Sequence, residues 1–149
     1  MNIFGKASTS SQYQLIVAIK AIIDDLVSRA SSNNNAFPPA VVNISVTSPM
    51  LNAFLDYAID ALASDTGVTI VLAAGNTDVA SAVTTQAGGD ACKVALATSP
   101  HTLVVGSIDI NTVTTASAFS NMGPCVGLFA PGSQVWSARA AGAFMSVDR

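Results

Sequence analysis

Val68-Thr69-Ile70-Val71-Leu72-Ala73-Ala74-Gly75-Asn76 begins as a continuous apolar run and ends in three small residues and an amide. An uninterrupted apolar run of this length is typical of a strand buried on both faces of a parallel sheet. Ligands of open α/β sheets bind beyond the carboxyl ends of the strands. A substrate backbone can lie against the small residues Ala73–Gly75, and the Asn76 amide can donate a hydrogen bond to an oxyanion without titrating. A plain Gly-Asn turn is the alternative interpretation.

Helix and strand patterns alternate on both sides of this stretch. Apolar residues recurring at spacings of three and four predict helices over residues 12–30 and 51–64. Short apolar or β-branched runs predict strands over residues 41–46, 68–72, 102–105, 126–129 and 135–136. Residues 76–91 are predicted to form a loop, and Pro131-Gly132 a turn. This alternation argues for an α/β fold with a mainly parallel sheet, and no linker divides the chain.

Composition excludes several classes of protein. The 149 residues are 50% hydrophobic and 10% charged, which suits one domain, or a piece of one, with a buried core. The net charge is −3 and no Lys/Arg cluster occurs, so neither nucleic acid nor an anionic membrane is an expected partner. No apolar run reaches the roughly 18 residues of a membrane-spanning helix. Residues 1–11 are polar and carry Lys6, so no signal peptide is predicted within this chain.

Other residues that can carry chemistry are interpreted as structural. His101, the single histidine, lies in a Ser-Pro-His turn and is predicted to be a surface residue. The acidic residues of the two helices form two pairs: Asp24 with Asp25, and Asp56 with Asp60. Both pairs are interpreted as solvated helix surfaces, the first together with Arg29. No Cys/His cluster has the spacing of a zinc site, so no metal ligand is assigned.

Several segments carry a resemblance to a known family. They occur in this order: Ala73-Ala74-Gly75-Asn76, Asp90-Ala91-Cys92, Val104-Val105-Gly106-Ser107, Ala118-Phe119-Ser120-Asn121-Met122-Gly123, and Cys125-Val126-Gly127-Leu128-Phe129-Ala130-Pro131-Gly132. Together they resemble the subtilisin-like serine proteases (subtilases, peptidase S8), most closely the proteinase K and aqualysin branch. The resemblance implies a three-layer α/β subtilisin-like fold with a mainly parallel sheet. Residues 1–149 would then be a partial domain, its central to C-terminal part.

The resemblance also implies the roles of particular residues. Asn76 matches the family's oxyanion-hole asparagine, and Ala73, Ala74 and Gly75 match one wall of the pocket for the residue before the scissile bond. Ser45, Val46 and Thr47 match the strand that pairs with the substrate backbone. The family has a Gly-Gly pair at the end of that strand, whereas this chain continues into Ser48-Pro49, and proline has no N–H to donate.

A disulfide and a calcium site are further implications. Cys92 and Cys125 match a disulfide of the aqualysin branch, which would indicate an oxidising compartment and a secreted parent protein. Two free buried thiols are the alternative. The branch holds a structural Ca²⁺ with carbonyls near Pro100 and Thr102 and with an Asp where this chain has Gly127. Losing that charged ligand predicts an empty site, so no cofactor is expected.

The catalytic triad of the family is absent from this sequence. Neither the His-Gly-Thr-His motif of the base nor the Gly-Thr-Ser-Met-Ala motif of the nucleophile occurs, and the nearby Ser146 lacks the surrounding pattern. The expectation is therefore a truncated fragment of a serine endopeptidase, inactive as this chain, whose parent acts on peptide or protein substrates. One alternative is a non-catalytic pseudoprotease that binds an extended peptide by strand addition. A remnant without a function of its own is the other.

Overall fold

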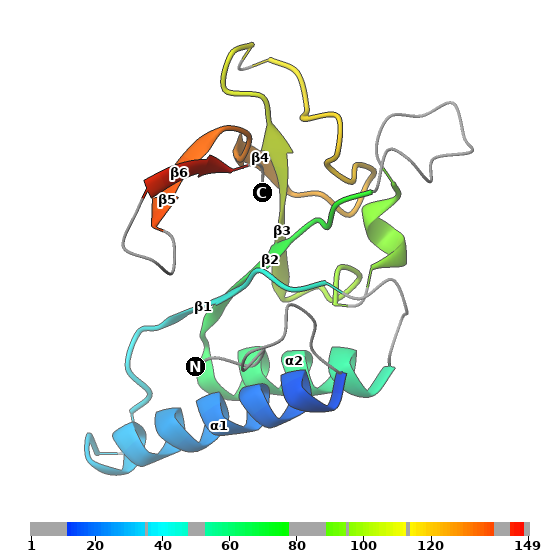
Figure 1. Cartoon of the computed structure of the whole chain (residues 1–149). Helices are drawn as coiled ribbons and strands as arrows, with labels where there is room; N and C mark the ends of the chain where they lie inside the picture. The colour runs from blue at the N-terminus through cyan, green and yellow to red at the C-terminus, as the bar shows by residue number, and fades with distance from the viewer. Residues whose placement is uncertain are drawn as a thin grey trace.

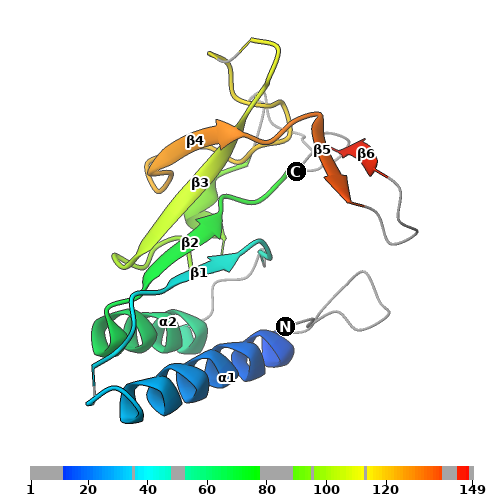
Figure 2. The ribbon, with the colours of Figure 1, turned by 90° about the vertical axis from the view of Figure 1, so that its left-hand side faces the viewer.

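The central feature of the fold is a parallel four-stranded sheet with two helices on one face. The computed structural model describes residues 12–34, 36–47, 53–77, 89–94, 96–112, 114–138 and 144–147. The strands lie in the order β1 (Val41–Ile44), β2 (Thr69–Ala73), β3 (Thr102–Ile108), β4 (Leu128–Pro131). Helices α1 (Gln12–Ser31) and α2 (Ala53–Thr66) lie side by side below the sheet (Figures 1 and 2). Two shorter pieces complete the described part: the 3₁₀ turn η1 (Ala91–Lys93), and the antiparallel pair of β5 (Val135–Ala138) and β6 (Phe144–Val147).

The two helices form where the apolar spacing predicts them. In α2 the side chains of Leu55, Ile59 and Leu62 are almost fully buried, because positions three and four apart share one face of a helix. The helix stops at Gly67, whose φ of +69° is a left-handed conformation that glycine adopts without strain. The Gly67 N–H donates to the carbonyl of Ala63 over 2.9 Å and so uses one of the unpaired carbonyls at the helix end.

Alternate side chains of the strands meet these helices and form the core. Val42 and Ile44 of β1 point to the same face as Ile70 and Leu72 of β2, and Val104 of β3 completes this layer. All five are at most 9% exposed. Because strand side chains alternate between the two faces, the helices can cover only half of them. The hydrophobic core therefore lies between the helices and one side of the sheet.

The opposite face of the sheet is less covered in the described part of the chain. Val41 of β1, Leu103 of β3 and Leu128 of β4 are 68%, 37% and 42% exposed, and Val71 of β2 is half-buried. The apolar run 68–72 predicts a strand buried on both faces, and only the helix side meets that prediction. The described residues thus supply the sheet and one helical layer of the expected architecture.

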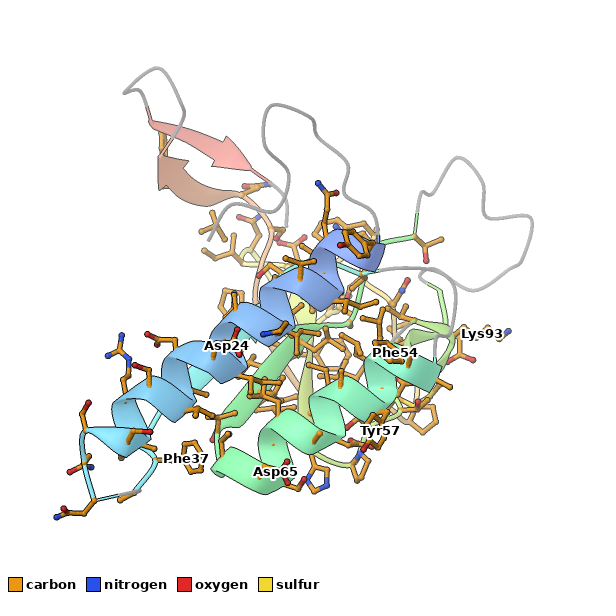
Figure 3. The ribbon with its side chains drawn as sticks, turned by 90° about the horizontal axis from the view of Figure 1, so that it is seen from below. Asp24, Phe37, Phe54, Tyr57, Asp65 and Lys93 are labelled. Carbon is orange, nitrogen blue, oxygen red and sulfur yellow. A yellow bond between two sulfur atoms is a disulfide. The ribbon has the colours of Figure 1, made fainter. Side chains whose placement is uncertain are left out.

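The outer surface of α1 confirms the interpretation of its acidic pair. Lys20 and Asp24 form an ion pair of 2.6 Å, and Arg29 and Asp25 form another of 2.7 Å. The hydrogen bond from Arg29 to Asp25, together with the carboxylate charge, raises the pKa of Arg29 above its usual value. Figure 3 views this helical side, with Asp24 on α1 and the exposed Tyr57 on α2.

Several strand boundaries differ from those that the sequence predicts. β3 continues through Ile108 because its last residues pair with β4, with Gly106 opposite Phe129 and Ser107 opposite Ala130. β4 begins at Leu128, two residues after the predicted start, because the Val126 N–H donates to the Gly123 carbonyl in a turn. Its last residue is Pro131, which was expected in a turn. Among the described strands β4 is an edge, where a missing N–H is tolerated. Strand β6 was not predicted.

Candidate functional site

A groove opens at the carboxyl ends of the strands, on the face of the sheet opposite the helices. Its volume is about 710 Å³. Six of the seven residues expected to form the site line it: Ser45, Thr47, Ala73, Ala74, Gly75 and Asn76. Val46 does not line it, as expected for the middle residue of an extended segment whose neighbours face the groove. The rest of the lining consists of Asn43, Val71, Leu72, residues 105–107, Ser120 and residues 130–132.

The backbone from Ala73 to Asn76 forms one side of this groove. The Ala74 N–H donates to the carbonyl of Val105 over 2.9 Å, so pairing with β3 continues beyond the end of β2. Gly75 follows with φ +87°, a conformation that strains any residue with a Cβ. A Cβ at Gly75 would also lie 2.8 Å from the Asn121 Nδ2. Glycine is therefore required here on two independent grounds.

Asn76 presents an exposed amide at the groove. Its side chain is exposed and hydrogen-bonds to no described residue. Its backbone is fixed by an antiparallel bridge to Ser120: the Thr77 N–H donates to Phe119 over 2.8 Å, and the Asn121 N–H donates to Gly75 over 2.9 Å. A fixed backbone that carries an exposed NH₂ group, to which no described residue is hydrogen-bonded, is the arrangement that an oxyanion donor requires.

Sequence reasoning did not assign a role to Asn121, which the structure places beside the residues that flank Asn76. The side chain is only 6% exposed and uses both ends of its amide. Its Nδ2 donates to the Ala74 carbonyl over 3.0 Å. Its Oδ1 accepts from the Thr77 hydroxyl at 2.5 Å and from the Gly89 N–H at 3.0 Å. Asn121 belongs to a segment that carried the family resemblance, but its partners are far away in sequence and so gave no local signal.

Buried hydroxyl groups lie close to the groove. Ser107 and Ser117 share a hydrogen bond of 2.6 Å, and the Ser120 hydroxyl accepts from the Ser107 N–H over 2.9 Å. A nucleophilic serine needs a base within hydrogen-bond distance. His101 does not meet this need, because it is exposed in the turn before β3, and Ser107 lies six residues further along that extended strand, about 20 Å away. The prediction of a surface turn for His101 is confirmed.

A disulfide joins Cys92 to Cys125, with Cα atoms 5.3 Å apart. The prediction of a disulfide is thereby confirmed, and the alternative of two free thiols is excluded. Asp90 caps η1 by accepting from the Cys92 N–H over 3.0 Å. The same segment pairs with the chain near Met122: the Ala91 N–H donates to its carbonyl over 2.8 Å. The disulfide therefore fastens η1 to the segment that also carries Asn121.

A match to a known protein family accompanies this geometry. The model of the Subtilase family, Peptidase_S8, matches residues 3–147. The chain belongs to the subtilase family. It is 39% identical over 115 residues to the alkaline serine exoprotease A of Vibrio alginolyticus, covering 76% of this chain and 19% of that protein. It is 33% identical over 143 residues to a cuticle-degrading serine protease of Arthrobotrys oligospora, covering 91% of this chain and 32% of that protein.

A solved subtilase structure supports the same assignment. A cold-adapted subtilisin-like serine proteinase superposes with a TM-score of 0.71 at 30% identity, covering 94% of this chain and 42% of that one. The subtilisin-like α/β fold is therefore confirmed. This chain spans less than half the length of each of these relatives.

One prediction about the acidic residues of this subtilase is wrong. Asp56 and Asp60 are half-buried and bind a turn far along the chain, rather than forming a solvated surface. Asp56 accepts from the Leu96 N–H over 3.0 Å, and Asp60 accepts from the Ser99 hydroxyl. Leu96 has φ +72°, so the two carboxylates fasten a turn with a strained residue onto α2.

The residues at the family's calcium position do not fit a hard cation. Gly127 offers no carboxylate, and a Cβ there would lie 2.9 Å from a methyl group of Leu103. Across the described ranges, no three His, Cys, Asp or Glu side chains gather as metal ligands. Of the helices that the structure describes, none combines the length and the apolar character needed to cross a bilayer. Ser48 and Pro49 lie outside the described residues, and the Ser146 side chain is likewise not described.

Proposed function

We propose that this chain supplies the oxyanion donor and one substrate-binding wall of a secreted, subtilisin-like serine endopeptidase. The observation that carries the proposal is the exposed amide of Asn76, which forms no hydrogen bond to a described residue, on a backbone fixed on both sides. When a serine attacks a peptide carbonyl, negative charge develops on the carbonyl oxygen. A donor that is already oriented stabilises this charge without reorganising during the reaction.

The walls of the groove suit an extended peptide. Ala73, Ala74 and Gly75 project little beyond Cβ, so a peptide backbone can approach their main chain closely. Ser45 and Thr47 line the groove from the segment that continues β1, where a substrate strand would run beside Val46. The substrate would thus lie between the segment 45–47 and the segment 73–76, with its scissile carbonyl near Asn76.

We further propose that these 149 residues do not hydrolyse peptides alone. Peptide hydrolysis of this kind needs a nucleophile and a base in contact, and the sequence carries neither family motif for them. The buried serines beside the groove have no histidine within reach among the described residues. The triad of the active protein would therefore come from polypeptide beyond these residues.

The disulfide supports two finer parts of the proposal. Cys92 and Cys125 stand at the positions of a disulfide of the aqualysin branch, which favours the proteinase K and aqualysin branch within the family. Disulfides persist in oxidising compartments and are rare in the cytosol. A secreted parent protein is the compartment assignment that fits this crosslink.

A non-catalytic peptide-binding module is the second candidate function. The observation that favours it is the combination of a formed groove with the absence of both triad motifs from the sequence. Such a module would hold an extended peptide by adding it as a strand, with backbone hydrogen bonds supplying the affinity.

The first test is to sequence the transcript on both sides of this segment and to express the protein that it encodes. If it encodes the histidine and serine motifs, kcat should fall about 10²- to 10³-fold in Asn76→Leu with a small change in KM, the magnitude known from an oxyanion asparagine of subtilisin. Asn111→Leu is the control, because Asn111 is also exposed but lies away from the groove. An unchanged kcat in Asn76→Leu would overturn the assignment.

If the transcript encodes only these residues, the endopeptidase proposal fails. The module is then tested by adding an extended peptide to ¹⁵N-labelled protein. Chemical shift changes confined to residues 45–47 and 73–76 would support the module. No chemical shift change even in large excess of peptide would leave the chain without either function.

A further inference from the structure

We infer that Asn121 is a positioning residue that holds the Asn76 amide at the groove, an inference that rests on the function proposed above. Asn121 binds the chain on both sides of Asn76 and forms no hydrogen bond to the Asn76 side chain. Through Nδ2 and its own N–H it binds the carbonyls of Ala74 and Gly75, and through Oδ1 it binds the Thr77 hydroxyl. Ala74 and Thr77, on either side of Asn76, are thus attached to one buried side chain, and Gly75 is attached to the backbone of the same residue.

The partners of Asn121 fix which way its amide points. A carbonyl such as that of Ala74 can only accept, and a backbone N–H such as that of Gly89 can only donate. The NH₂ group must therefore face Ala74 and the oxygen must face Gly89, because the flipped amide would lose both bonds. An aspartate has the same size but no donor, so it would turn an oxygen toward the Ala74 carbonyl. Asparagine is thus chemically required, beyond merely fitting the space.

The space around this amide leaves no room for a longer side chain. A Cβ at Gly75 would lie 2.8 Å from the Asn121 Nδ2, and a Cβ at Gly89 would lie 2.6 Å from its Oδ1. Both neighbouring segments therefore press on the amide at positions where only glycine fits. Lengthening Asn121 to glutamine would push its amide into these backbones, so movement of Asn121 would be transmitted directly to Gly75.

We call the Asn121 side chain and its hydrogen bonds to Ala74, Thr77 and Gly89 the clamp. The clamp is separate from the packing that holds the fold together. The hydrophobic core between the helices and the sheet consists of apolar side chains, and Asn121 is not one of them. Pairing of β2 with β3 ends beside Ala74, whose N–H donates to Val105. Beyond that point Asn76 depends on its backbone bridge to Ser120 and on the Asn121 side chain. Loss of the side-chain bonds should therefore leave Asn76 held by the backbone bridge alone and more mobile, while the strands stay in place.

Backbone dynamics of this 149-residue chain test the inference without any need for activity. We expect the order parameter of the Asn76 N–H to fall from about 0.85 to below about 0.6 in Asn121→Asp, while that of Leu72 in β2 stays rigid. Ile59→Val is the matched control, since it weakens the buried core without touching the groove. An Asn76 order parameter equal to that of the unmodified chain would overturn the inference, as would an equal fall in Ile59→Val.

A milder pair of variants decides the matter if Asn121→Asp does not fold. Thr77→Val has nearly the same shape as threonine but no hydroxyl to donate to Asn121, whereas Thr77→Ser keeps the donor. Greater mobility of Asn76 in Thr77→Val, with recovery in Thr77→Ser, supports the clamp. Equal rigidity of Asn76 in both variants contradicts it.

Kinetics of the active parent protein, if the transcript encodes one, separate this inference from the proposed function. Displacing a donor should lower kcat about 10- to 100-fold in Asn121→Asp with KM nearly unchanged. In an Asn76→Leu background the same change should lower kcat no further, because residues that act as a unit are not additive. A full additional loss in that background would show that Asn121 does not act through Asn76. If Asn76→Leu itself leaves kcat unchanged while the order parameters behave as expected, the proposed function fails and the clamp stands.

Discussion

Replacing both cysteines by alanine should lower the free energy of unfolding by about 3.7 kcal/mol in the chain-entropy model, given a sequence separation of 33 between Cys92 and Cys125. The crosslink acts chiefly on the unfolded chain, because it keeps the two ends of the loop between Cys92 and Cys125 together. For a chain of this length the loss corresponds to a fall in melting temperature of about 7–15 °C. It is a large fraction of the roughly 5–15 kcal/mol that typically separates native from unfolded proteins.

Urea unfolding followed by circular dichroism measures this effect. Two quantities should change together: the midpoint should fall, and the m-value should rise because the unfolded chain without the crosslink exposes more surface. The matched control is the unmodified chain under reducing conditions, which should unfold like the double variant. A loss below about 1 kcal/mol would refute the reasoning, because it would mean that the unfolded chain gains little freedom when the disulfide is absent.

Two further pairs of substitutions test the local geometry, each pair consisting of a variant and its control. Gly75→Ala should destabilise the chain in urea by about 2–5 kcal/mol and by more than Gly67→Ala, since overpacking against the Asn121 amide adds to the strain of a positive φ. Gly67→Ala has a positive φ in open space, so it should lose only about 1–2 kcal/mol, and an equal loss at both sites would refute the contact argument. Asp56→Ala should cost about 1–3 kcal/mol because it strands a backbone N–H, whereas the exposed Asp24→Ala should change unfolding by less than about 1 kcal/mol. Equal losses for the two aspartates would restore the view of Asp56 as a surface residue.

The helices and the strand centres could be predicted from the sequence because their signals are local. Helix α2 shows its periodicity within its own residues, and the run Val68–Leu72 predicts β2 to within one residue at each end. Boundaries were less predictable, because partners elsewhere set them. Gly106 and Ser107 have little strand preference, yet both lie in β3 since β4 pairs with them.

The candidate site divides in the same way. The small residues and the amide of 73–76 stand together in the sequence, so their chemistry could be inferred without a structure. The roles of Asp56 and Asn121 depend on partners 32 or more positions away. Nothing near Asp56 distinguishes a carboxylate that binds a distant turn from one that faces water. The family motifs placed Asn121 in a recognisable segment but said nothing of the three backbone segments that it joins.

The strand order of the sheet has a consequence for biosynthesis. In β1-β2-β3-β4 each strand lies beside the one made just before it, so spatial order repeats the order of translation. As the chain leaves the ribosome, every new strand can dock on an edge that already exists, and none has to be inserted between two strands formed earlier. Chains emerge at about 5–20 residues per second, far more slowly than a helix or a short loop forms. The part of the sheet formed by the described strands can therefore grow vectorially, from β1 toward β4.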